Sequence, residues 1–130
     1  MNAVWIVDDD RSIRWVLEKA LTREEIPYKS FGAAAEVLAA LEGTTQPPQV
    51  LVSDIRMPGE SGLSLLSKVK ARFPHIPVII MTAFSDLDSA VSAFQGGAFE
   101  YLPKPFDVDQ AVDLVRRAIE ESVHQTSVVE

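Results

Sequence analysis

The middle of the chain reads Val50-Leu51-Val52-Ser53-Asp54-Ile55-Arg56-Met57-Pro58-Gly59. The first four residues of this stretch have the composition of a buried strand, and its Pro-Gly end favours a turn that neither a strand nor a helix can continue. Asp54 is therefore expected at the carboxyl end of a strand. In open α/β sheets this edge is where ligands bind, because the loops after several strands meet there.

Short apolar segments alternate with segments of helical periodicity on both sides of this stretch. The expected strands are residues 4–7, 28–31, 50–53, 78–81 and 99–102. The expected helices are residues 12–26, 33–41, 61–73, 87–95 and 109–122. This alternation predicts an α/β fold, (βα)5, with a doubly wound, five-stranded parallel sheet covered by helices on both faces. Residues 1–122 would form one domain, and residues 123–130, which have no apolar period, a tail or the start of a linker.

In two of the expected helices the apolar positions predict which side chains are buried. The third is expected to bury Leu63, Leu66, Val69 and Phe73. The fourth is expected to bury Leu87, Ala90, Val91 and Phe94 on a thin apolar face, and to end at Gly96-Gly97. A helix with few buried contacts is held weakly against the sheet. The fourth helix is therefore expected to be the one that can change its position in the fold.

Composition excludes several functional classes. The 130 residues are 47% hydrophobic, enough for a sizeable core, and the net charge of -7 disfavours direct nucleic-acid binding. The chain has no cysteine, which removes disulfides and thiolate chemistry. No apolar run is long enough for a signal peptide or a membrane span. We therefore expect a cytoplasmic domain without membrane contact.

Polar residues follow four of the five expected strands. They are Asp8-Asp9-Asp10, Asp54, Thr82 and Lys104. Right-handed crossovers bring these strand ends to one rim of the sheet. Crowded carboxylates raise one another's pKa unless a cation joins them, and Mg²⁺ accepts carboxylate oxygens while keeping positions for water and phosphate. A carboxylate beside Mg²⁺, a lysine and a hydroxyl is suited to phosphoryl transfer onto aspartate.

Together, the acidic residues 8–10, Asp54 followed by Met-Pro-Gly, Thr82-Ala83 and Lys104-Pro105-Phe106 resemble the signature of receiver domains of two-component response regulators. The resemblance covers residues 4–120. More narrowly, residues 10–18, 53–59 and 85–91 are similar to receivers of nitrogen-regulation transcriptional activators of the NtrC type. The family implies a flavodoxin-like sheet with strand order 2-1-3-4-5.

The resemblance also implies roles for single residues. Asp54 would accept a phosphoryl group from a phosphohistidine on an NtrB-like sensor histidine kinase. Lys104 would pair with one phosphoryl oxygen, and the Thr82 hydroxyl would bind another. The implied Mg²⁺ set contains Asp9 as a direct ligand, Asp8 acting through water, Asp54, the backbone carbonyl of Arg56, and Asp10, which also stands at a helix start. A shift of one residue would exchange the roles of the three consecutive acids.

A switch is implied as well. When Thr82 moves toward the phosphoryl group, Tyr101 would turn inward to fill the vacated space, and the fourth helix, with Leu87 and Val91, would shift. Phe84 stands where NtrC-like receivers usually carry histidine. Full-length regulators of this type also contain an ATPase domain and a helix-turn-helix DNA-binding domain, and a phosphorylation-dependent homodimer is a further expectation.

Two other functions remain open at this point. Asp8-x-Asp10-x-Ser12 resembles the nucleophile motif of haloacid-dehalogenase-like phosphatases, with Asp8 as the nucleophile. No flap insertion follows Asp10, however, and Asp54 would then have no role. The other alternative is a pseudo-receiver that keeps the fold without phosphorylation. We predict a receiver that is not an enzyme beyond self-catalysed transfer of phosphate to Asp54 and its later loss.

Overall fold

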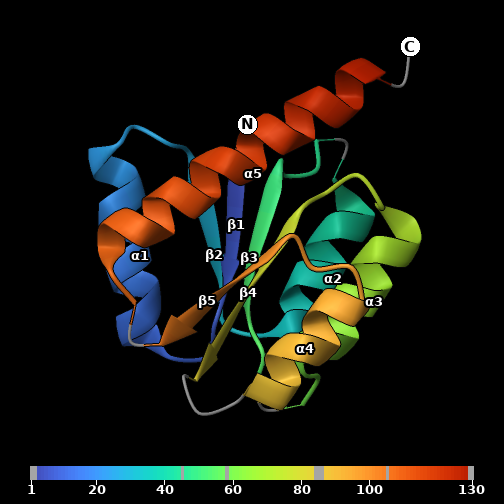
Figure 1. Cartoon of the computed structure of the whole chain (residues 1–130), viewed down its shortest axis with the longest axis horizontal. Helices are drawn as coiled ribbons and strands as arrows, with labels where there is room; N and C mark the ends of the chain where they lie inside the picture. The colour runs from blue at the N-terminus through green and yellow to red at the C-terminus, as the bar shows by residue number, and fades with distance from the viewer. Residues whose placement is uncertain (1–2, 45, 58, 84–86, 105, 129–130) are drawn as a thin grey trace.

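The structure is a computed structural model that describes residues 3–44, 46–57, 59–83, 87–104 and 106–128. Strands and helices alternate along the chain (Figure 1). The strands are β1 Val4–Val7, β2 Tyr28–Phe31, β3 Val50–Asp54, β4 Val78–Ala83 and β5 Glu100–Lys104. The helices are α1 Arg11–Arg23, α2 Ala34–Gly43, α3 Gly62–Arg72, α4 Leu87–Gln95 and α5 Val108–Val128. The expected alternation is confirmed.

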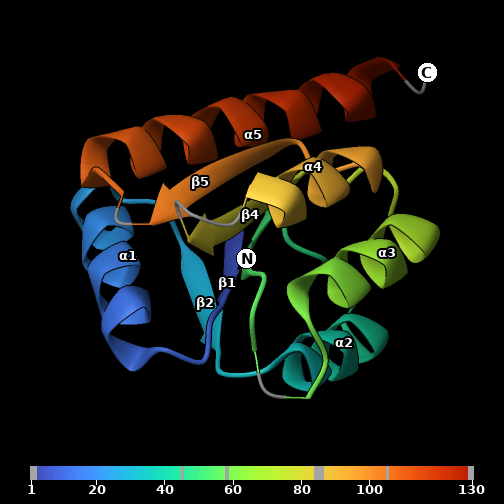
Figure 2. The same ribbon diagram turned by 60° about the horizontal axis from the view of Figure 1, so that its bottom comes forward.

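All five strands are parallel, in the order β2-β1-β3-β4-β5. This is the predicted order, and it confirms the doubly wound α/β fold. Helices α1 and α5 cover one face of the sheet, and α2, α3 and α4 cover the other (Figure 2). Because both faces are covered, the central strands must be apolar on both sides, which explains their continuous rather than alternating hydrophobic runs.

Successive residues of β1 point into two separate cores. Val4 and Ile6 pack with Leu17 under α1 and α5, whereas Trp5 and Val7 face α2 and α3. Every residue of β1 and β3 is buried. The strand ends are therefore rigidly placed, and the loops that follow them start from fixed points.

Two helix starts follow the capping chemistry of the sequence. The Asp10 side chain accepts a hydrogen bond of 2.8 Å from the backbone N–H of Ser12, so Asp10 caps α1. The Ser61 hydroxyl accepts one of 3.1 Å from the N–H of Ser64 and caps α3. These bonds satisfy N–H groups that have no partner within the helix.

The apolar face of α3 differs from the expected one. Leu65 is completely buried, together with Leu66 and Val69, while Leu63 and Phe73 are only half-buried at its margin. The predicted stripe was therefore wrong at its ends. The core lies closer to the Leu65 side of the helix because α3 packs against both the sheet and α2.

Helix α4 buries only part of the predicted face. Ala90 and Ala93 are buried, but Val91 is 55% exposed and Phe94 is 44% exposed. The expectation that Val91 and Phe94 are buried was wrong, because small alanines allow the helix to lie close to the sheet. Gly97, with a φ of +100°, ends the helix as predicted, and the N–H of Ala98 donates to the Ala93 carbonyl at 2.9 Å.

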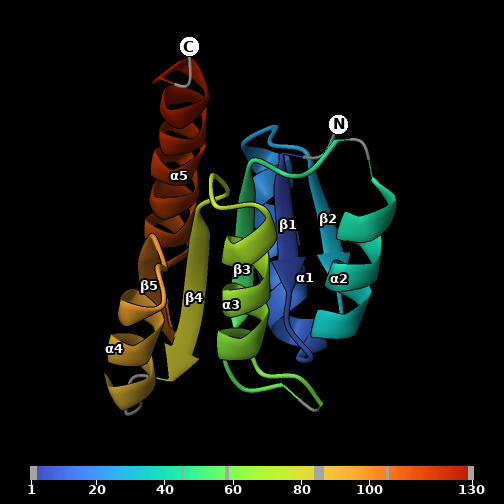
Figure 3. The same cartoon turned by 90° about the vertical axis from the view of Figure 1, so that its right-hand side faces the viewer.

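Helix α5 is longer than predicted. It continues to Val128 instead of ending at Ser122, so residues 123–128 are helical rather than an irregular tail (Figure 3). The sequence from Val123 to Val128 contains neither glycine nor proline, so nothing local stops the helix. None of the helices in the described part of the chain has the length and apolar composition needed to cross a bilayer.

Leu65→Ala and Leu63→Ala test the observed face of α3. Leu65→Ala is expected to lower the free energy of unfolding by about 3 kcal/mol, because it leaves a cavity in the core. Leu63→Ala should cost about 1 kcal/mol, since the side chain is already partly in water. Urea unfolding followed by circular dichroism measures both. Equal losses, or a larger loss for Leu63, would contradict the assignment.

Candidate functional site

Three carboxylates meet at the carboxyl edge of the sheet. Asp8 directly follows β1, Asp9 is next to it, and Asp54 is the last residue of β3. Each offers an oxygen, and these oxygens all lie within 4.8 Å of one another. Since β1 and β3 are neighbours, with Val7 paired to Ser53, the sheet itself brings these acids together. The predicted acidic cluster is thus present in the fold.

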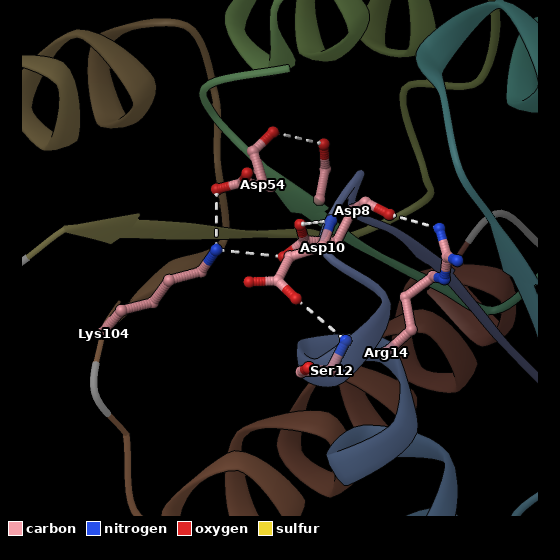
Figure 4. A network of polar contacts seen from close by, with 7 residues as sticks. Asp8, Asp10, Ser12, Arg14, Asp54 and Lys104 are labelled. Atoms are coloured by element: carbon pink, nitrogen blue, oxygen red, sulfur yellow. Dashed lines mark hydrogen bonds and ion pairs between the residues drawn. The ribbon is translucent and has the colours of Figure 1, made fainter. Parts of the chain in front are cut away.

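Lys104 joins two of these acids. Its Nζ lies 3.0 Å from Asp8 Oδ2 and 3.1 Å from Asp54 Oδ1, so one ammonium group bridges both carboxylates (Figure 4). Lys104 is the last residue of β5 and pairs in register with Ala83 of β4. The side chain therefore reaches across β4 to the centre of the sheet edge.

Asp8 is held on every side. Its Oδ1 accepts from the Asp10 backbone N–H at 2.8 Å, its Oδ2 contacts Lys104, and its carbonyl accepts from Arg14 Nη1 at 2.7 Å (Figure 4). Its side chain is 0% exposed, compared with 11% for Asp54. Asp54 is thus the more accessible of the two carboxylates that contact Lys104.

Burial and neighbouring charge shift the pKa values of this pair. Burial, followed by the negative charge of Asp8, raises the pKa of Asp54, and the nearby Lys104 only partly opposes this. Burial would lower the pKa of Lys104, but its hydrogen bonds and attraction to Asp8 and Asp54 outweigh that effect and raise it. The lysine therefore stays charged, while excess negative charge remains in the cluster.

The other predicted site residues are less closely grouped. Asp10 is exposed and caps α1, and among the described residues the carboxylates close enough to share a metal ion are those of Asp8, Asp9 and Asp54. Its carboxylate is directed to the helix start by the cap bond. Thr82 is buried on β4, directly after Met81, which pairs with Asp54. Arg56 lies two residues beyond Asp54 and is exposed.

The structure describes only part of the predicted switch. Tyr101 is half-buried on β5, and its ring meets the Phe94 ring of α4 edge-on, with centroids 5.6 Å apart and an interplanar angle of 89°. Val91 is exposed on the same helix. Phe84 and the side chain of Leu87 lie outside the described residues. Phe94, which the sequence-based set of switch residues omitted, is the aromatic partner of Tyr101.

Two further residues support the acids without having been predicted to do so. Arg14 binds the Asp8 carbonyl from the second turn of α1, and the Ser53 hydroxyl donates to the Asp54 carbonyl at 3.0 Å. Both contacts are close in sequence, but they depend on the backbone and side-chain conformation, which the residue pattern does not specify. Both fix the main chain next to a carboxylate.

Comparison with known proteins agrees with this geometry. Residues 4–116 match the family described as response regulator receiver domain, and the chain belongs to that family. Within it, the sequence is of the NtrC type. It is 65% identical over 115 residues to the DNA-binding transcriptional regulator NtrC of Klebsiella pneumoniae and 64% identical over 116 residues to NtrC of Escherichia coli K12. The matches cover 88% and 89% of this chain, which spans 24% of the length of each relative.

A solved structure shares the fold as well. The apo form of the receiver domain of nitrogen regulatory protein C, determined in solution, has a TM-score of 0.81 and 61% sequence identity. The match covers 92% of this chain and 97% of that one. These comparisons support a receiver domain over the phosphatase and pseudo-receiver alternatives.

Asp54→Asn is expected to raise the free energy of unfolding of the metal-free protein at neutral pH. The pKa of Asp54 in the folded chain lies above its ordinary value of 3.8, so wild-type stability falls as pH rises from that value through the folded one. Asparagine does not titrate, so its advantage should disappear below about pH 4, where both states of the wild-type carboxyl are protonated. Urea unfolding in EDTA across this pH range measures the difference. An advantage that is independent of pH would contradict the charge-based explanation.

Proposed function

We propose that Asp54 accepts a phosphoryl group from a phosphohistidine of a sensor histidine kinase, and that this domain reports the signal to output domains. The observation that carries the proposal is the Lys104 ammonium lying 3.0 Å from Asp8 and 3.1 Å from Asp54. Asp54, the more accessible of the two carboxylates, would be the nucleophile. The Lys104 ammonium beside it would stabilise the negative charge of the phosphoryl group.

Mg²⁺ fits the donor set of this site. The ligand atoms offered by Asp8, Asp9 and Asp54 are all carboxylate oxygens, which suit a hard divalent cation, and they lie within 4.8 Å of one another. Asp9 and Asp54 would bind the ion directly, Asp8 would do so through water, and the Arg56 carbonyl would complete the protein ligands. When bound, the ion would neutralise the cluster and the charge on the phosphoryl oxygens.

In the proposed transfer, an Asp54 carboxylate oxygen attacks the phosphorus atom. The P–N bond of the phosphohistidine breaks, its electron pair returns to the imidazole, and an aspartyl phosphate forms. Lys104, already beside Asp54, would bind one phosphoryl oxygen, and the Thr82 hydroxyl would bind another. The domain would act on no separate substrate, because only its own Asp54 gains and loses the phosphoryl group.

Asp8 is a poor alternative nucleophile. Its carboxylate is fully buried, and its two oxygens are occupied by the Asp10 N–H and by Lys104. A phosphatase that uses Asp8 would have to break both contacts before attack. Attack by Asp54 would leave both contacts of Asp8 in place. This difference supports the receiver over the phosphatase.

The output side of the proposal involves β5 and α4. Movement of Thr82 toward the phosphoryl group would open space for Tyr101, whose ring now contacts Phe94 of α4. Inward rotation of Tyr101 would remove that contact and change the exposed apolar surface that contains Val91 and Phe94. Phosphorylation would thus shift the population between two packings of α4. Phe84, and Leu87 at the start of α4, would take part in this change.

The partners follow from the same role. We propose an NtrB-like kinase as phosphodonor, an ATPase domain and a helix-turn-helix DNA-binding domain as outputs in a longer protein, and a phosphorylation-dependent homodimer. DNA would be bound by the output domain, since this chain has a net charge of -7. The receiver would span residues 1–122, because Ser122 is buried and Val123 is 51% exposed. The cytoplasm, where ATP supplies kinases, is the compartment this requires.

Labelling with acetyl phosphate tests the phosphoacceptor. Incubation with Mg²⁺ and acetyl phosphate, followed by chemical trapping of the aspartyl phosphate and mass spectrometry, is expected to place the label on Asp54. Asp54→Asn should remain folded and lose the label. Label on Asp8 would support the phosphatase instead, and no label on any aspartate would support the pseudo-receiver.

Asp9→Asn and Asp10→Asn form a matched pair for the metal site. Both remove one exposed negative charge from the same loop, but only Asp9 belongs to the acidic cluster, and asparagine at position 10 can still cap α1. We expect Asp9→Asn to weaken Mg²⁺ binding by at least about tenfold, and Asp10→Asn by less than about threefold. Titration followed by tryptophan fluorescence or calorimetry measures both. Equal effects would contradict the assignment of the ligands.

A further inference from the structure

Gly62, the first residue of α3, lies directly against the main chain of Asp54. A Cβ atom placed on Gly62 would overlap the Asp54 carbonyl oxygen, and it would lie 2.8 Å from Ile55 Cα and 2.9 Å from the Asp54 carbonyl carbon. All three neighbours are backbone atoms, which cannot move aside as the end of a flexible side chain can. A side chain at position 62 therefore forces either α3 or the end of β3 to shift.

The surroundings leave little room for such a shift. The Gly62 N–H donates to the Ile55 carbonyl at 2.7 Å, and the Ile55 N–H donates to the Met81 carbonyl at 3.1 Å. The Ser53 hydroxyl holds the Asp54 carbonyl at 3.0 Å. The end of β3 is thus bonded to the start of α3 on one side and to β4 on the other.

Space, rather than conformation, requires glycine at this position. Gly62 lies in the first turn of a helix and has no positive φ, whereas Gly59 and Gly97 do. Any residue could adopt its backbone angles, and alanine has a helix propensity higher than glycine by about 1 kcal/mol. Propensity alone predicts that Gly62→Ala is stabilising, and the backbone overlap predicts the opposite.

We propose that Gly62 is a positioning residue for phosphoryl transfer. By letting α3 rest on the Asp54 carbonyl, it sets where the Asp54 carboxylate stands relative to Lys104 and to the other two acids. Asp8, Asp9 and Lys104 are placed by β1 and β5, so displacement of the end of β3 moves the nucleophile relative to these three groups. This inference rests on the proposed function, since it concerns the same carboxylate.

Gly62→Ala is the test, and Gly43→Ala is the matched control. Gly43 ends α2, and no atom lies within 4 Å of the position of its added Cβ. Both variants are labelled with saturating acetyl phosphate and Mg²⁺ at 10 °C in sucrose, which favours the folded state, and rates are given per folded molecule from circular dichroism. We expect Gly62→Ala to lower the maximal labelling rate at least about tenfold, because a small misplacement of the nucleophile is costly, and Gly43→Ala to leave it unchanged.

Each outcome separates the inference from the proposed function. A folded Gly62→Ala variant that is labelled at the wild-type rate overturns the positioning role, since loss of stability alone does not change the rate per folded molecule. Wild-type protein that takes no label contradicts the proposed function itself.

If Gly62→Ala does not fold under these conditions, amide hydrogen exchange of the wild-type protein provides the test. Saturation with Mg²⁺ and beryllofluoride, a phosphoryl mimic, should slow exchange at Gly62 and not at Gly43, and an unchanged rate at Gly62 overturns the proposal.

Discussion

The bridge from the Lys104 ammonium to the Asp8 and Asp54 carboxylates is the interaction on which the site depends. Asp8 is fully buried, and a buried carboxylate without a charged partner would cost several kcal/mol, so the Lys104 ammonium stabilises the fold. With Asp9, the cluster contains three carboxylates and one ammonium group. The site is therefore left with an excess of negative charge. A divalent cation bound there would relieve it, and its binding would then stabilise the folded state.

The fold maintains this unfavourable arrangement by fixing the main chain next to the acids as well as their side chains. Arg14 holds the Asp8 carbonyl, Ser53 holds that of Asp54, and Gly62 allows α3 to pack directly on the latter. Carboxylates on flexible loops would move apart to lower their repulsion. Carboxylates at the ends of buried strands cannot, and the rigid sheet therefore pre-organises the negative charge of the cluster.

Strand β5 connects the site to a distant surface. Lys104 ends the strand at the acidic cluster, and Tyr101, three residues earlier, meets Phe94 on α4. The same helix exposes Val91 and buries only small alanines among the residues described for it, so few large side chains hold it against the sheet. Strand β5 thus carries, three residues apart, one side chain at the acidic cluster and one that contacts the exposed apolar surface of α4.

The sequence by itself determined the alternation of strands and helices, the parallel sheet and the residues at its carboxyl edge. Buried strands and the polar residues that follow them are encoded by consecutive residues, so they can be recognised locally. Asp54, Lys104 and the acids after β1 were identified in this way, and the resemblance supplied the strand order. Only the tertiary structure decided that Asp10 lies outside the group formed by Asp8, Asp9 and Asp54, that α4 turns Val91 and Phe94 outward, and that Gly62 rests on Asp54. These features depend on how one element packs on another, and helical periodicity gives an apolar direction without saying how closely a helix approaches the sheet.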